Sequence, residues 1–331
     1  MNQWRRRRDL LPLAPLLLAS IGIIGQAAPA AAQAWPARPL RAVVGFAPGG
    51  GVDLAARVIA RRLAEVLGQQ VVVENRPGAG STVAAAYVAR TEPDGYTLMV
   101  GETAMFTGPI LYPSTRFDPV ADFVPVMRMA VAPLGIAVPA ALGIADLSSA
   151  LDRARRAPAP WRYGTPGVGT AQHLVGEMLR QAASVPLEHV PYRGGAPAIT
   201  ALLAGEVEMA VASLPSLTAA VASGGVRLLG VTTAARVPGL AEIPAVAETI
   251  SGFEAAPGIF LLAPAGTPAP VVARLAQAGA EVGRDAAIGA ALVSAGLLLG
   301  DTAGPAELAA QVAEETRRWS ELARATGARL E

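Results

Sequence analysis

The sequence contains no cysteine and no lysine, and it has only two histidines. Without cysteine the chain forms no disulfide, has no thiolate nucleophile and offers a metal no sulfur ligand. Without lysine it has neither a Schiff-base amine nor the lysine that a P-loop requires. With two histidines, a histidine-ligated metal site is a poor explanation of function.

Charge is scarce as well, because only 16% of the residues are charged, and 27 basic against 26 acidic residues leave a net charge of +1. Binding to nucleic acid requires a strongly basic face, so we expect no nucleic-acid partner. Hydrophobic residues make up 52% of the chain, enough for a sizeable core. The 331 residues suit about two domains.

The N-terminal segment has the layout of a signal peptide. Four arginines at 5–8 precede an apolar run from Leu10 to Ile24, and Ala32-Gln33-Ala34 fits the cleavage pattern. We therefore expect residues 1–34 to be removed on export to a bacterial periplasm, with the choice between general and twin-arginine export left open. A membrane anchor is the alternative, but it needs about 20 apolar residues, and prolines interrupt this run.

Strand and helix signals alternate twice along the rest of the chain. The order strand–helix–strand–helix–strand covers residues 40–101 and returns over residues 161–212. It predicts parallel strands with helical crossovers, hence an α/β fold in two halves. Apolar stretches with proline and glycine at 130–138 and 255–265 predict two crossings that form a hinge. One lobe then comprises residues 35–135 and 256–331, and the other residues 136–255.

Glycines gather in two loops that we name the first loop (residues 45–53) and the second loop (residues 163–170). Each stands between a predicted strand and a predicted helix, where free backbone N–H groups and about half a positive charge attract anions. Two such cradles suit a small molecule with a carboxylate at each end. Each loop alone is more often an ordinary strand-to-helix connection, and the presence of one in each half is what favours a ligand site.

Several side chains near these loops have two interpretations each. Asp53 either caps the following helix or accepts a hydrogen bond from a ligand. Arg193 either clamps a carboxylate or is a solvated surface arginine. His173 and Glu177 share a helix face, but they lack a third metal ligand, so a packed histidine is the more common explanation.

Motifs of common enzyme classes are missing. The chain contains no Gly-x-Ser-x-Gly nucleophile elbow. Glu74 has the right place for a ribose contact in a dinucleotide fold, but Pro48 breaks the required glycine pattern. These observations argue against a hydrolase of this class and against a dinucleotide enzyme, and we expect no cofactor and no metal.

Short motifs stand in a fixed order along the chain: Phe46–Asp53, Glu74–Gly80, Tyr163–Thr170 with His173 and Glu177, His189–Gly194, Pro197-Ala198, Val231–Thr233 with Arg236, and Ala263–Pro268. In this ordered set, which extends from about Trp35 to the C-terminus, the chain resembles the substrate-binding proteins of tripartite tricarboxylate transporters, the Bug family. Each motif alone is weak, whereas the ordered set is specific.

The resemblance implies a two-lobed Venus-flytrap fold, type II-like, of the periplasmic binding proteins, each lobe a mainly parallel sheet flanked by helices. It also implies no catalysis, integral membrane transporter subunits as partners, and ligands such as di- or tricarboxylates, acidic amino acids or aromatic acids. Carried over residue by residue, it places these side chains and backbones at the ligand: Phe46, Pro48, Gly49, Gly50, Asp53, Thr165, Gly169, Thr170 and His173.

The chain also departs from the family pattern at positions that would tune specificity. Arg193 stands where a lysine is common, Ser213 follows a strand that lacks the usual aromatic residue, and Thr103 lies in an unusual Gly-Glu-Thr-Ala-Met segment. Glu102 in that segment, if it points into the cleft, would disfavour a second ligand carboxylate. We expect a monomeric periplasmic receptor that delivers an organic carboxylate to a transporter, with a receptor for a sensor kinase or an exported enzyme as alternatives.

Overall fold

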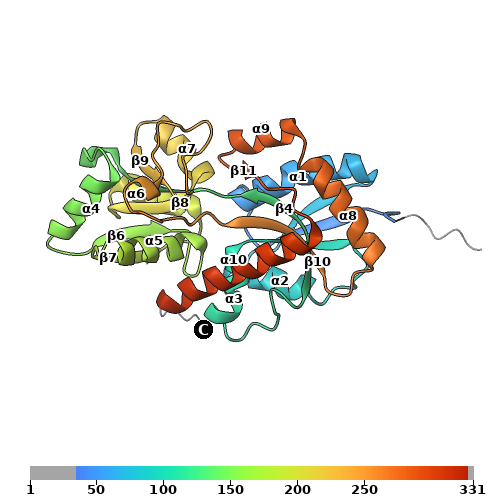
Figure 1. The fold of residues 1–331 in the computed structure, drawn as a ribbon. Coiled ribbons are helices and arrows are strands. Elements are labelled where there is room, and N and C mark those ends of the chain that lie inside the picture. The colour runs from blue at the N-terminus through green and yellow to red at the C-terminus, as the bar shows by residue number, and fades with distance from the viewer. Residues whose placement is uncertain (1–34, 327–331) are drawn as a thin grey trace, which may run out of the picture. The chain divides into compact units, whose positions relative to one another are not determined.

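The structure is a computed structural model that describes residues 35–326, and the predicted signal peptide lies outside the described residues. Two separate β-sheets organise this part of the chain (Figure 1). The first sheet has six strands in the order β11-β4-β10-β3-β1-β2. Their bounds are β1 Leu40–Val44, β2 Val71–Asn75, β3 Thr97–Gly101, β4 Phe123–Val131, β10 Gly258–Pro264 and β11 Leu298–Leu299.

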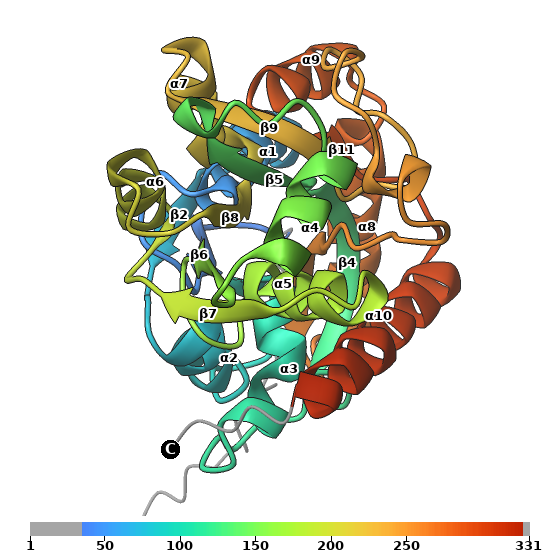
Figure 2. The same cartoon turned by 90° about the vertical axis from the view of Figure 1, so that its left-hand side faces the viewer.

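The second sheet has five strands in the order β7-β6-β8-β5-β9. Their bounds are β5 Leu134–Pro139, β6 Trp161–Thr165, β7 Leu187–Pro191, β8 Met209–Ser213 and β9 Val226–Val231. Helices pack on both sheets, as the turned view also shows (Figure 2). They are α1 Gly51–Leu67, α2 Thr82–Val88, α3 Thr103–Leu111, α4 Leu147–Arg156, α5 Ala171–Ala182, α6 Gly195–Ala204, α7 Leu214–Ala222, α8 Ala269–Val282, α9 Ala286–Ser294 and α10 Pro305–Thr326.

The two sheets confirm the predicted two-lobed α/β fold, but each sheet is mixed rather than mainly parallel. Strands β1, β2 and β3 pair in parallel, as do β6, β7 and β8. Strands β4 and β10 in the first sheet and β5 and β9 in the second pair antiparallel to their neighbours. The antiparallel pairs arise because β5 and β10 are the first strands after the two crossings and run against both neighbours: β10 lies between β3 and β4, and β5 lies between β8 and β9.

The chain passes from the first sheet to the second between β4 and β5 and returns just before β10. The two passing segments touch, because the Ala132 amide donates to the Pro257 carbonyl at 2.9 Å. Helix α10 also contacts both halves. Its residues Leu308 and Val312 pack with Phe106 and Phe260, whereas Trp319 packs with the core around the second sheet.

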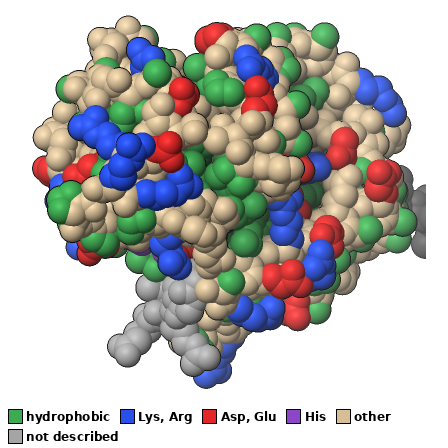
Figure 3. All heavy atoms as spheres, turned by 60° about the vertical axis from the view of Figure 1, so that its left-hand side comes forward, with side chains coloured by type: hydrophobic (Ala, Val, Ile, Leu, Met, Phe, Trp, Pro, Cys, Tyr) green, Lys and Arg blue, Asp and Glu red, His purple; other side chains and the backbone are tan. Residues whose placement is uncertain are grey.

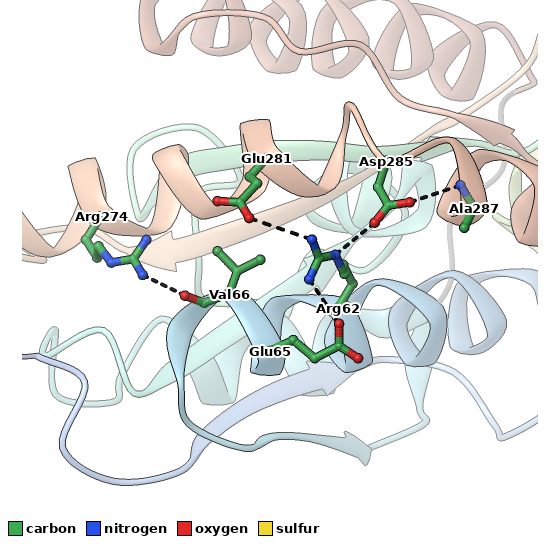
Figure 4. Close-up of polar contacts among 7 residues, drawn as sticks. All are labelled: Arg62, Glu65, Val66, Arg274, Glu281, Asp285 and Ala287. Atoms are coloured by element: carbon green, nitrogen blue, oxygen red, sulfur yellow. Dashed lines mark hydrogen bonds and ion pairs between the residues drawn. The ribbon is translucent and has the colours of Figure 1, made fainter.

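Helix α1 shows how the sequence positions one loop. Ala55, Ile59 and Leu63 recur at helical spacing and are buried against the sheet, and the helix ends at Gly68 in the left-handed conformation. Its C-terminal half is tied to α8 and α9 through polar contacts of Arg62 and Arg274 (Figure 4).

In this network Arg62 binds Asp285 at 2.8 Å and Glu65 at 3.0 Å, and Arg274 donates to the Val66 carbonyl at 2.8 Å. Asp285 in turn caps α9 by accepting from the Ala287 amide at 2.9 Å. A network of this kind holds more firmly than one isolated surface pair. The far end of α1 is thereby fixed, and its amino end is presented at the edge of the sheet.

Candidate functional site

The predicted ligand residues lie at the carboxyl ends of parallel strands in both sheets. In the first sheet Val44 is in register with Asn75 and with Val100, so the segments after β1, β2 and β3 leave from one edge. In the second sheet Thr165 is in register with Pro191, which places the segments after β6 and β7 at one edge as well. In α/β folds this edge is where ligands bind.

The two edges come together at the amino ends of α1 and α7. A methyl group added to Gly51 would lie 4.0 Å from Cβ of Ser213 and 3.6 Å from Cδ2 of Leu297. Gly51 is the first residue of α1, and Ser213 directly precedes α7. The first loop therefore lies beside the segment that follows β8.

Asp53 organises the first loop rather than capping α1. The residue that caps α1 is Gly50, and Asp53 is only 2% exposed. Its carboxylate accepts from the Gly49 amide at 2.9 Å, from Asn75 Nδ2 at 2.8 Å, and from Arg57 at 3.0 Å and 2.9 Å. Asn75 Nδ2 also donates to the Phe46 carbonyl at 3.0 Å. Both ends of the loop are thus held by one buried carboxylate and its amide partner.

These contacts also settle the charge of Asp53. Burial by itself would raise the pKa of the carboxyl, but the hydrogen bonds from Arg57, Gly49 and Asn75 outweigh it and lower the pKa below its ordinary value. Asp53 is therefore ionised at neutral pH, and the four contacts occupy both of its oxygens. Around it, Phe46 is half-buried against the core, Pro48 and Gly49 are exposed, and Gly50 is half-buried.

The second loop is held by hydroxyl and imidazole groups. Thr170 caps α5, because its hydroxyl accepts from the His173 amide at 3.3 Å and donates to the Gly167 carbonyl at 2.8 Å. The Gly169 amide donates to Nδ1 of His173 at 3.1 Å. Gly169 was expected to offer its N–H to a ligand, but this N–H is already used. The first amides of α5, which have no acceptor inside a helix, remain as donors.

His189, on β7 beside the second loop, is a residue that the sequence reasoning did not select. Its Nε2 lies 2.6 Å from the Thr165 hydroxyl, and Thr165 is completely buried. The His189 ring stacks on the His173 ring with centroids 4.0 Å apart. The motif His189–Gly194 contained the signal, but the stack joins β7 to α5 and cannot be read from spacing along the chain.

Two buried hydroxyls stand at the carboxyl edge of the first sheet without a hydrogen-bond partner among residues 35–326: Ser81 Oγ and Thr103 Oγ1. Ser81 has a φ of 74°, which is uncommon for a residue other than glycine. Its side chain lies so close to Gly45 that any β-carbon there would overlap it, so position 45 requires glycine. Unpartnered buried hydroxyls are costly in a folded protein and often mark a site.

Glu102, between these hydroxyls in the chain order, is only 6% exposed. Its carboxylate accepts from the Ala104 amide at 3.1 Å and so caps α3. Burial raises the pKa of Glu102 to about 7, and the nearby carboxylate of Glu315 adds to the rise. The sequence analysis expected Glu102 to disfavour a second ligand carboxylate only if its side chain points into the cleft. This condition is not met, because the Glu102 carboxylate is bound to the start of α3.

The two remaining predicted residues lie at the edge of the second sheet. The Ser213 hydroxyl is 2.8 Å from the Ser216 hydroxyl, one turn into α7. Arg193 is exposed and forms no hydrogen bond or ion pair with the rest of residues 35–326. By contrast Arg57 and Arg76, at the first sheet, are paired with Asp53 and Glu74.

A hollow of about 540 Å³ lies elsewhere, at the amino end of β6, and is lined by Ser149, Asp152, Arg153, Arg156, Ala157, Pro158 and Trp161. On this side of the molecule basic and acidic side chains are interspersed, without a face of one sign (Figure 3). Within residues 35–326, no three His, Asp or Glu side chains gather into a potential metal site. No described helix has the length and apolar character to cross a membrane.

Residues 55–328 match the family of tripartite tricarboxylate transporter receptors. The chain belongs to this receptor family. It is 32% identical over 321 residues to the protein BugT of Bordetella pertussis, covering 95% of this chain and 98% of BugT.

Solved structures confirm the fold of the periplasmic binding proteins. The periplasmic binding protein BugD is 32% identical, with a TM-score of 0.79 over 90% of this chain and 100% of that chain. An R. palustris protein solved with adipate is 34% identical, with a TM-score of 0.83 over 89% of this chain and 100% of that chain. MatC of Rhodopseudomonas palustris, solved with malate, is 30% identical, with a TM-score of 0.77 over 87% of this chain and 99% of that chain.

Proposed function

We propose that this receptor binds a small organic carboxylate between its two lobes in the periplasm and delivers it to the integral subunits of a tripartite transporter, without chemical turnover. The observation that carries the proposal is the meeting of two carboxyl edges, where Gly51 at the start of α1 lies beside Ser213 at the start of α7. Helix amino ends attract anions through free N–H groups and the helix dipole. Relatives solved with adipate and malate support the ligand class.

In this proposal the backbone binds the carboxylate and the side chains shape the backbone. The donors are the first amides of α1 and α5, and Asp53 and Thr170 hold the two loops in place. Arg193 is a basic side chain that is free to reach a ligand carboxylate, whereas Arg57 and Arg76 beside the first loop are paired. Thr103 and Ser213 lie at the edges as hydroxyl partners, and the protein acts as a monomer.

Closure about the crossings at residues 132–133 and 256–257 completes the site. We assign residues 35–135 and 256–331 to one lobe and residues 136–255 to the other. A ligand shifts the open–closed equilibrium only by its difference in affinity for the two states, so it has to contact both lobes when they close.

The ligand class is tested by thermal melting and titration calorimetry with an acid panel of adipate, malate, glutamate and benzoate. We expect at least one acid to raise the melting temperature and to be recovered unchanged. If no acid raises it, or if a product forms, the proposal is wrong.

The position of the site is tested by Gly50→Val and Thr170→Val. Gly50 has φ −80°, and the nearest atom to an added methyl group is 3.9 Å away, so valine is accommodated, whereas Thr170→Val costs about 1 kcal/mol as a lost helix cap. Both variants should lose the melting shift caused by the best acid of the panel. Gly304→Val is the matched control, because it also changes a glycine before a helix and an added methyl group there meets nothing within 4 Å. If both variants keep the full shift, the site lies elsewhere.

A further inference from the structure

The second loop is built around two glycines whose conformations need outside support. Gly167 has φ 152° and Gly169 has φ 78°, both in the range that favours glycine. Glycine brings no side chain that could fix such a loop, and its backbone has the largest freedom to lose. Neighbouring groups must therefore hold the loop if its helix is to present donors in a fixed direction.

Two imidazoles supply this support from different elements. His173 of α5 accepts the Gly169 N–H on Nδ1 at 3.1 Å, so its own proton is on Nε2. His189 of β7 lies 2.6 Å from Thr165 Oγ1, and that oxygen is 3.3 Å from the Gly167 amide and 3.2 Å from the Gly167 carbonyl. Each histidine thus controls one of the two glycines, His173 directly and His189 through Thr165.

Stacking joins the two imidazoles into one unit. The centroids of their rings are 4.0 Å apart, and the ring planes are inclined by 21°. The ring of Tyr163, on β6, lies 5.1 Å from the ring of His189. His173 is 5% exposed. On the packed elements the charged groups near the pair are Glu177 and Arg180, which bind each other at 2.8 Å, and the Tyr163 hydroxyl donates to Glu177 at 2.7 Å.

The pair works only when both rings are neutral. A proton on Nδ1 of His173 would face the Gly169 N–H, and two imidazolium rings at this distance would repel each other. Burial lowers the pKa of His189 to about 3, with a further contribution from His173, and burial also lowers the pKa of His173 against the opposing effect of Glu177. Both shifts favour the neutral imidazole at neutral pH.

We propose that His189 and His173 are positioning residues: through their hydrogen bonds, as neutral imidazoles, they fix the second loop so that the amino end of α5 points at the ligand. The proposal rests on the proposed carboxylate-binding function. His189 itself does not touch the ligand. It acts through Thr165, which explains why a residue of β7 matters to donors that belong to α5.

Two substitutions separate the hydrogen bond from the ring. His189→Phe keeps a stacking ring and removes the contact to Thr165, whereas His189→Gln removes the ring and keeps an amide that can donate to or accept from the Thr165 hydroxyl. Calorimetry with the tightest-binding acid of the panel should give a Kd at least tenfold weaker for His189→Phe and within threefold of the wild type for His189→Gln. Trp161→Phe is the control, because it alters a buried aromatic residue at the opposite end of β6 and should change the Kd less than twofold.

Nuclear magnetic resonance gives a second readout that requires no ligand. At pH 7 the His173 Nδ1 should show the nitrogen shift of an unprotonated acceptor, and His173→Phe should move the Gly169 amide resonance strongly. The positioning role would be overturned if folded His189→Phe bound the acid with the wild-type Kd. It would also be overturned if His189→Gln weakened the Kd as much as His189→Phe. If the wild type binds no acid of the panel, the proposed function is wrong. The hydrogen bond from Gly169 to His173 is tested independently of any ligand, and an unshifted Gly169 resonance in His173→Phe would contradict it.

Discussion

The first and second loops have the same place in their sheets, after a strand and before a helix, yet they are held by opposite kinds of chemistry. The first loop is fixed by a charged group, Asp53, with Arg57 and Asn75 around it. The second is fixed by neutral groups, namely Thr165, His189 and His173. An anion site needs shaped backbone donors, and either kind of support can shape them. The two loops should therefore differ in how their stability depends on pH and on the substitution of single side chains.

The largest expected effect comes from removing the charge at the first loop. Asp53→Ala leaves the Gly49 amide, Asn75 and Arg57 without their acceptor and should lower the free energy of unfolding by about 3 kcal/mol, with loss of ligand binding. Urea denaturation and calorimetry measure both. Glu65→Ala is the control on the same helix, because its ion pair with Arg62 is exposed and should change stability by less than about 0.5 kcal/mol.

A carboxyl at the same edge without such support should behave in the opposite way. The pKa of Glu102 is raised from 4.5 to about 7, first by burial and then by Glu315. The folded state therefore binds this proton more tightly than the unfolded state, and stability is lost as pH rises from 4.5 through 7. Glu102→Gln should be more stable than the wild type by about 3 kcal/mol at pH 8 and equal to it at pH 4.

Denaturation at the two pH values checks this prediction. Glutamine keeps an oxygen for the Ala104 amide, so the helix cap is retained. A variant that is equally stabilised at both pH values, or destabilised at pH 8, would show that the charge of Glu102 is not the unfavourable element.

The supports of the two loops should also lose their stabilising effect at different pH values, and this is the smallest of the expected effects. The pKa of His189 is lowered from 6.5 to about 3. Between these pH values the unfolded state binds a proton on His189 and the folded state does not, so the free energy of unfolding falls as pH drops from 6.5 to 3. The pKa of Asp53 is lowered as well, so its stabilisation is lost only below its ordinary value of 3.8. His189→Gln should reduce the pH slope of stability between 6 and 4 by about one proton.

Denaturation curves across this range measure the slope directly. Asp53→Asn should leave the slope between pH 6 and 4 unchanged, because its proton is exchanged at lower pH. If the two substitutions change the same part of the curve, the contrast between a charged and a neutral support is wrong.

The sequence predicted much of the fold because local signals and packing agree there. The alternation of strands and helices over residues 40–101 and both glycine loops carry their periodicity and turn residues in the chain itself. Helix α3 was missed because most of its residues are buried, so no polar face marks a period, and Pro109 stands inside it. The mixed sheets were missed because the direction of β4 and β10 depends on the crossings and not on local pattern.

The candidate site divides in the same way. The loops and the residues on them were predicted from composition and motifs, whereas the roles of several side chains were not. That Asp53 accepts from Asn75, and that His189 supports Thr165, depends on strands that pair across each sheet. Such contacts join residues far apart in the chain, and spacing along the sequence carries no signal for them.

The most direct test of the account is a crystal structure of the receptor with the tightest-binding acid of the panel. The account predicts that carboxylate oxygens of the acid accept hydrogen bonds from the first amides of both α1 and α5, with Arg193 turned toward the acid and Asp53 still bound to the Gly49 amide. An acid held at the hollow beside Trp161, or held in the cleft by side chains alone with both helix ends turned away, would contradict it.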